Sequence, residues 1–141
     1  MANIDHLYDL YYDNLSGRVF QLDVSEIGSK GRITNTYYVR FQDYQADHLI
    51  GQGSNWHAEK VEAFQRMCYP STWKMVGEYQ DSHGVRLDAD ILVGGQNCFF
   101  AFRYDDELDD ETYYPCSCIL DDIRDCSYSP LWKIDSISEI E

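Results

Sequence analysis

The chain has 141 residues, enough for one domain, and its 25 acidic and 11 basic residues give it a formal net charge of −14. This charge argues against direct nucleic-acid binding, because contacts to phosphate groups need clustered lysines and arginines. Hydrophobic residues make up 44% of the chain, which predicts one folded domain over residues 1–141, and the apolar runs are far shorter than the about 20 residues of a membrane helix.

Helical and strand periodicities alternate in the first part of the chain. Residues 4–15 place apolar side chains at every third or fourth position, which predicts an amphipathic helix. Residues 18–24 and 33–41 instead alternate apolar and polar side chains, as half-buried strands do, and the turn sequence at 28–31 predicts that they form a hairpin. The face of the second strand that is expected to point inward carries Ile33, Tyr37, Val39 and Phe41.

A second helix and a run of strands are predicted next. Residues 55–68 carry an apolar stripe that ends before Pro70, which is typical of a helix. Alternation returns over 73–79, 87–93 and 98–104, with Phe100, Phe102 and Tyr104 on one face of the third of these strands. Because the connections are short, we expect an antiparallel meander of three strands.

These patterns predict an α+β fold, a single domain with an antiparallel sheet of five or six strands and two main helices. Residues 131–137 are the last predicted strand, whereas 112–130 have no clear periodicity, and the acidic run 105–111 is expected to be a solvated loop. The side chains expected to be mostly buried are Phe20, Leu22, Val39, Phe41, Phe64, Ile91, Val93, Phe100 and Phe102.

The negative charge is concentrated towards the C-terminus. Residues 1–80 carry a net charge of −3 and residues 81–141 a net charge of −11, and the stretch 105–125 alone carries −8. Such a stretch is either a solvated surface or a face that complements a basic partner, with interleaved tyrosines as anchors. On the second interpretation the partner-binding residues are Asp105, Asp106, Glu107, Asp109, Asp110, Glu111, Tyr113, Tyr114, Asp121, Asp122 and Asp125.

The five cysteines do not predict a metal site or a disulfide scaffold. Their number is odd and no secretory signal precedes them, so we expect reduced thiols in a cytoplasmic protein. Cys116, Cys118 and Cys126 have a spacing unlike that of the common zinc sites, which favours buried thiols and no bound metal. The sequence also lacks the local motifs of hydrolases and metalloproteases, so we expect neither an enzyme nor a cofactor.

Three functions are compatible with these patterns. The first is an inhibitory binding protein that blocks a basic nucleic-acid-handling protein, such as a nuclease, as a nucleic-acid mimic of the phage anti-CRISPR or anti-restriction type. The second is a bacterial toxin-immunity protein, which would share the small size and acidic charge. The third is an enzyme or small-ligand binder with an aromatic pocket between sheet and helix.

Overall fold

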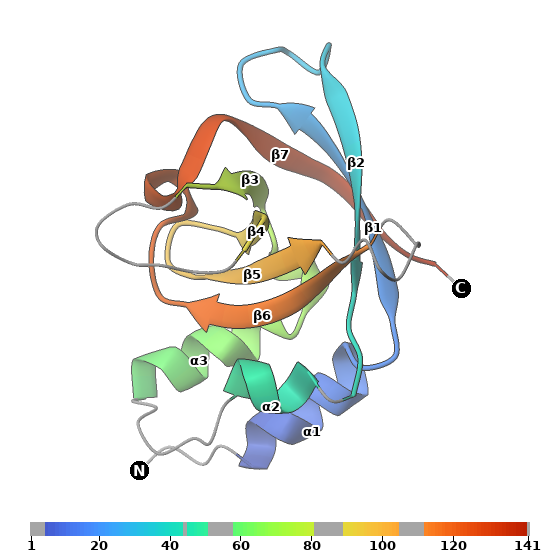
Figure 1. The fold of residues 1–141 in the computed structure, drawn as a ribbon, viewed down its shortest axis with the longest axis vertical. Coiled ribbons are helices and arrows are strands. Elements are labelled where there is room, and N and C mark those ends of the chain that lie inside the picture. The colour runs from blue at the N-terminus through green and yellow to red at the C-terminus, as the bar shows by residue number, and fades with distance from the viewer. Residues whose placement is uncertain (1–4, 44, 51–57, 81–88, 105–111, 141) are drawn as a thin grey trace.

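A computed structural model describes residues 5–43, 45–50, 58–80, 89–104 and 112–140 of the chain. Seven strands in these ranges form one closed barrel in the order β1-β2-β6-β5-β4-β3-β7 (Figure 1). Their bounds are β1 Val19–Glu26, β2 Thr34–Arg40, β3 Met75–Tyr79, β4 Ile91–Gly94, β5 Phe99–Tyr104, β6 Tyr113–Ile119 and β7 Ser127–Ile140.

The barrel closes through β7, its longest strand. This strand pairs antiparallel with β3 near its beginning and with β1 along the rest of its length. Register shifts interrupt both pairings, between Val76 and Glu78 on β3 and between Asp23 and Val24 on β1. Such irregularities bend a strand, which allows one strand to follow the curve of a barrel. The other closure is a parallel contact between β2 and β6 at Val39 and Tyr113.

Three α-helices pack together beside the barrel, where Figure 1 shows them below the strands. Their bounds are α1 Asp5–Asn14, α2 Gln45–Ile50 and α3 Ala58–Met67, and two short 3₁₀ turns, η1 Pro70–Thr72 and η3 Ile123–Cys126, complete the described elements. The helices bury apolar side chains in the same cluster as the inward-facing residues of the barrel: Leu7, Tyr11, Leu49, Ile50, Phe64 and Met67 all belong to it. They therefore cover the barrel's interior.

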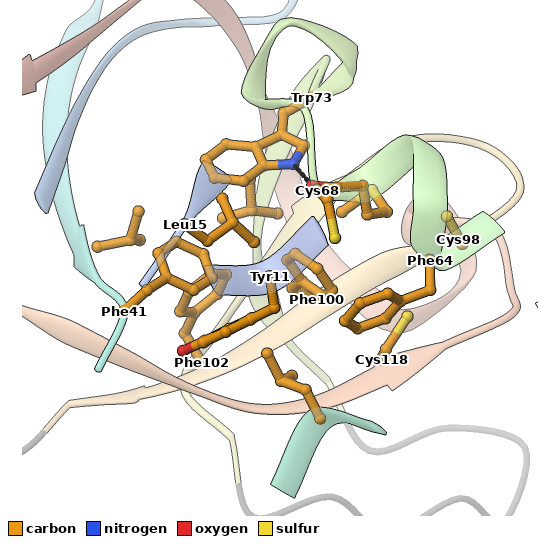
Figure 2. Close-up of a cluster of buried hydrophobic side chains, with 14 of the residues drawn as sticks. Tyr11, Leu15, Phe41, Phe64, Cys68, Trp73, Cys98, Phe100, Phe102 and Cys118 are labelled. Carbon is orange, nitrogen blue, oxygen red and sulfur yellow. Dashed lines mark hydrogen bonds between the residues drawn. The ribbon is translucent and has the colours of Figure 1, made fainter. Parts of the chain in front are cut away.

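Aromatic side chains fill that interior. Phe41 is completely buried, and five of its neighbours are aromatic rings with centroids 5.7–6.1 Å away: Tyr11, Phe20, Trp73, Phe100 and Phe102. Figure 2 shows Phe41 together with Tyr11, Trp73, Phe100 and Phe102. All nine side chains that the sequence analysis placed in the core are buried. A second, smaller cluster lies on the outer face of β4 and β5, where η3 covers Leu92, Phe99 and Ala101.

Many of the predicted elements are confirmed. The first helix, the hairpin of β1 and β2, and the antiparallel meander of β3, β4 and β5 are present, although β4 begins at Ile91, later than the predicted start at 87. Predicted residues 55–57 and 87–88 lie outside the described ranges, as does the expected loop at 105–111. Ile33, which was expected to face inward, is instead 51% exposed at the hairpin turn.

The predicted architecture, however, is wrong. The sheet is mixed and closed, with more than five or six strands, and three helices accompany it. The elements that were missed are α2 and β6, and the last strand is twice the predicted length. The closure of the sheet was missed because β7 pairs with two strands that are far apart in the sequence, and the periodicity of a short segment does not predict such a pairing. Within the described ranges, no helix is long and apolar enough to cross a membrane.

Candidate functional site

The acidic segment singled out by the sequence connects two neighbouring strands of the barrel. Six of the predicted partner-binding residues lie outside the described ranges: Asp105, Asp106, Glu107, Asp109, Asp110 and Glu111. The residues that flank this segment are described, since β5 ends at Tyr104 and β6 begins at Tyr113. These two tyrosines are register partners. The chain therefore leaves β5 and enters β6 at the same point of the barrel.

Three tyrosines from three strands gather at this point, and we call Tyr37, Tyr104 and Tyr113 the tyrosine rim. The centroid of the Tyr113 ring lies 6.0 Å from that of Tyr37 and 5.5 Å from that of Tyr104, both in edge-to-face geometry. Alternation explains the grouping, because Tyr37 lies two residues from the buried Val39, and Tyr104 two residues from the buried Phe102. The tyrosine rim is thus the next layer of inward-facing side chains after the buried interior. It lies nearer to solvent, since Tyr104 is 41% exposed.

A hollow of about 280 Å³ opens beside the tyrosine rim. It is lined by residues 35–38 of β2 together with Tyr104 and Tyr113. In the part of the chain that is described, β2 pairs with β6 only at Val39, so residues 35–38 leave one strand edge facing the hollow. In Figure 1 this is the place where the tip of β5 approaches β2.

Two carboxylates, Asp90 and Glu78, lie close enough to the rim to act on its phenol groups. Asp90 accepts a hydrogen bond from the backbone N–H of Tyr104 through Oδ2 at 2.7 Å. Burial raises the pKa of Tyr113 above its ordinary value, and the neighbouring groups Tyr37, Asp90, Tyr104 and Glu78 raise it further. Burial and then Glu78 also raise the pKa of Tyr37. The part of this shift that comes from carboxylate charge disfavours a phenolate and would equally favour a bound cation.

The two predicted tyrosine anchors differ in their accessibility. Tyr114 pairs with Arg103 of β5 and is only 8% exposed, whereas Tyr113 is half-buried at the rim. Tyr113 is therefore the predicted anchor that a partner can reach. The most open ring of the group is Tyr104, which was not among the predicted binding residues.

The remaining predicted acids, Asp121, Asp122 and Asp125, are not brought to the tyrosine rim. They lie in or just before η3, which packs against β3, β4 and β7 and appears on the opposite side of the barrel from the tip of β5 in Figure 1. Arg124 forms an ion pair with Asp122 at 2.6 Å, and its hydrogen bonds lower the pKa of that carboxyl group. Among the described residues, Asp121, Asp122 and Asp125 therefore lie away from Tyr104 and Tyr113, and a shared acidic surface over 105–125 stays a prediction.

The three clustered cysteines of the sequence lie on different faces of the barrel wall. The register between β5 and β6 shifts so that Cys116 is the extra residue of a β-bulge. Cys116 therefore packs with Cys126 against the outer cluster, whereas Cys118 belongs to the interior, where burial raises the pKa of its thiol. Among the residues the structure covers, no three His, Cys, Asp or Glu side chains are grouped as metal ligands. That the protein binds no metal stays a prediction.

Four residues of this site were not among the predicted partner-binding residues, namely Tyr37, Tyr104, Glu78 and Asp90. Alternation does place Tyr37 and Tyr104 on the inward faces of their strands. It does not show that β2 and β5 reach the same point of a barrel, which depends on the pairing of both with β6.

Comparisons with known proteins identify no relative of this chain. No protein-family model, no curated protein and no solved structure matches it.

Proposed function

We propose that this protein is an inhibitory binding protein of the cytoplasm, whose partner is a basic protein that handles nucleic acid. It would occupy the partner's nucleic-acid site, as anti-CRISPR and anti-restriction inhibitors of phages do. The observation that favours this proposal is the position of the tyrosine rim. Its two accessible rings, Tyr104 and Tyr113, stand at the two ends of the acidic segment 105–111.

The rim and the acidic segment would have separate tasks in such a complex. The segment 105–111 contains six carboxylates, and their field extends about 8–10 Å at physiological salt, which accelerates the encounter with a groove lined by Lys and Arg. Charge alone seldom gives a tight complex, so the buried aromatic contacts would supply most of the affinity.

The tyrosine rim suits a Lys or Arg side chain of the partner. A cation over the face of a tyrosine ring is attracted by the ring's quadrupole, by about 0.5–2 kcal/mol depending on its desolvation. Tyr113 contacts two further rings, and Glu78 and Asp90 add negative charge beside them. A basic side chain in the hollow would also lie against residues 35–38 of β2, which pair with β1 and with no other described strand.

The filled interior counts against the small-ligand alternative. A ligand-binding barrel keeps an internal cavity, but here Phe41, Phe100 and Phe102 occupy the space and lie in ring contact with one another. An immunity protein would use the same kind of surface against a nuclease toxin. The identity of the captured partner distinguishes that role from the anti-defence role.

The test is capture of the partner from host lysate at low and high salt, followed by mass spectrometry and then by binding kinetics with the purified partner. We expect a basic nucleic-acid-binding protein, and we expect added nucleic acid to displace it. Tyr104→Ala should weaken binding about tenfold or more, mainly through faster dissociation. Its matched control is Tyr69→Ala, since Tyr69 is similarly exposed, at 46%, but lies next to η1.

Charge variants test the other half of the proposal. Replacing Asp106, Asp109 and Asp110 by Asn should slow association and flatten its salt dependence, whereas Glu62→Gln on α3 should not. The proposal is wrong if nucleic acid does not compete, or if Tyr104→Ala behaves like Tyr69→Ala.

A further inference from the structure

Arg66 and Lys74 are two of the basic residues that have no carboxylate partner among the residues the structure describes. Arg18 is paired with Glu139, and Arg124 with Asp122. Across the described ranges, by contrast, neither Arg66 nor Lys74 forms an ion pair. The Lys74 ammonium donates a long hydrogen bond, 3.4 Å, to a backbone carbonyl. Both side chains are exposed.

Arg66 and Lys74 meet at one hollow of about 280 Å³. Arg66 comes from the last turn of α3, Lys74 from the approach to β3, and the third wall is the turn at residues 95–98 between β4 and β5. Three of the remaining lining side chains are polar and uncharged, namely Thr72, Gln96 and Asn97, and none of the described lining residues carries a carboxylate. This composition is unusual in a chain with 25 acidic residues.

The end of a helix normally presents carbonyl oxygens that would repel an anion, but here they are occupied. The carbonyl of Arg66 accepts hydrogen bonds from the backbone N–H of Tyr69 at 3.0 Å and from the Thr72 hydroxyl at 2.8 Å. The carbonyl of Met67 accepts the indole N–H of Trp73 at 2.9 Å, the bond drawn as a dashed line in Figure 2. The negative end of α3 is therefore partly neutralised by donors.

Cys98, which lines the same hollow, lies within reach of the charge of Arg66. Burial raises its pKa, and the charge of Arg66 acts in the opposite direction. Positive charge that favours a thiolate at this wall would equally favour a bound anion.

We infer that this hollow is an anion-binding site that takes a phosphate group, either as free phosphate or as a phosphomonoester. The guanidinium of Arg66 can donate two parallel hydrogen bonds to phosphate oxygens, and the ammonium of Lys74 adds a second charge. The side-chain amides of Gln96 and Asn97 are further donors at the same wall. The inference does not depend on the proposed function, because it concerns a different part of the surface.

The test is a titration of the ¹⁵N-labelled protein with inorganic phosphate, and separately with glycerol phosphate, followed by NMR at constant ionic strength. We expect saturable shifts of the amide signals of residues 95–98. Arg66→Gln and Lys74→Gln should each weaken binding about tenfold or more, because each removes a charged hydrogen-bond donor. Arg32→Gln is the matched control, since it removes the same charge from an exposed position in the turn between β1 and β2.

The results separate the possible ligands and the possible failures. Tighter binding of glycerol phosphate than of phosphate would identify a phosphomonoester site, and equal binding a site for the phosphate group alone. The inference fails if neither anion causes saturable shifts at residues 95–98. It also fails if Arg32→Gln weakens binding as much as Lys74→Gln does. Far-UV circular dichroism of each variant checks that the fold is retained.

Discussion

Replacing Phe41 by alanine tests whether the barrel is a filled core. Phe41 has no exposed surface, and its ring lies within 6.1 Å of five other aromatic rings, which come from α1, from two strands of the barrel and from the residue after η1. Phenylalanine-to-alanine changes in such cores cost about 3–5 kcal/mol, through lost transfer free energy and the cavity that remains. Because the ring contacts both barrel and helix, we expect about 4 kcal/mol.

Urea denaturation followed by far-UV circular dichroism measures this loss. With an m-value of about 2 kcal/mol per molar urea, the midpoint should fall by roughly 2 M. Phe41→Leu retains most of the apolar volume and should lose about 1–2 kcal/mol. Tyr69→Ala, which removes an exposed ring, should stay within about 0.5 kcal/mol of the parent protein. A loss below about 1 kcal/mol for Phe41→Ala would contradict the filled interior.

Three further outcomes follow from local geometry. Gly94→Ala should destabilise the fold by about 1–3 kcal/mol, because its Cβ would lie 2.4 Å from a backbone oxygen, whereas Gly95→Ala has open space and should change little in the same urea assay. Burial raises the pKa of Cys68 to about 12, so its thiol should resist Ellman's reagent at pH 8 until urea unfolds the chain. Arg124 lowers the pKa of Asp122 in the folded state. The ionised Asp122 carboxylate therefore stabilises the fold at pH values above its unfolded pKa of about 4, and this stabilisation is lost as the pH falls through the lower folded pKa. Asp122→Asn should flatten this part of the stability–pH curve.

Local patterns in the sequence predicted the parts of the fold that depend on neighbours in the chain. The alternation at 18–24 and 33–41 predicts the hairpin of β1 and β2, because each strand buries one face and a turn joins them. The stripe of residues 4–15 likewise predicts α1. In both cases the period of the side chains and the burial of one face are set within about ten residues.

The missed elements have local reasons as well. Strand β6 contains Pro115, and the bulge at Cys116 interrupts its alternation, so no regular period extends through it. Helix α2 is only six residues long, less than two turns, which is too short for a helical stripe to be recognised.

The candidate site depends on contacts that are remote in sequence. The inward direction of Tyr37 and Tyr104 is predictable from strand period, but their shared contact with Tyr113 needs the parallel bridge between β2 and β6. Asp121, Asp122 and Asp125 lie at η3, on another side of the barrel from the tyrosine rim. Net charge along a sequence therefore does not show which of the carboxylates share a surface with the rim.

The hollow at the tyrosine rim and the hollow at Arg66 and Lys74 are similar in size but have nearby charges of opposite sign. Binding at the two hollows should therefore depend differently on salt. A basic partner at the tyrosine rim would be attracted both by nearby carboxylates and by the net charge of −14, so salt weakens both effects together. A phosphate group at Arg66 and Lys74 would be attracted locally but repelled by the rest of the molecule. Added salt weakens that attraction but also screens the repulsion from charges beyond about 8–10 Å. Between low and physiological salt, phosphate binding should therefore change far less than partner binding, and a phosphate affinity that falls as steeply would mean that the two basic residues do not act at short range.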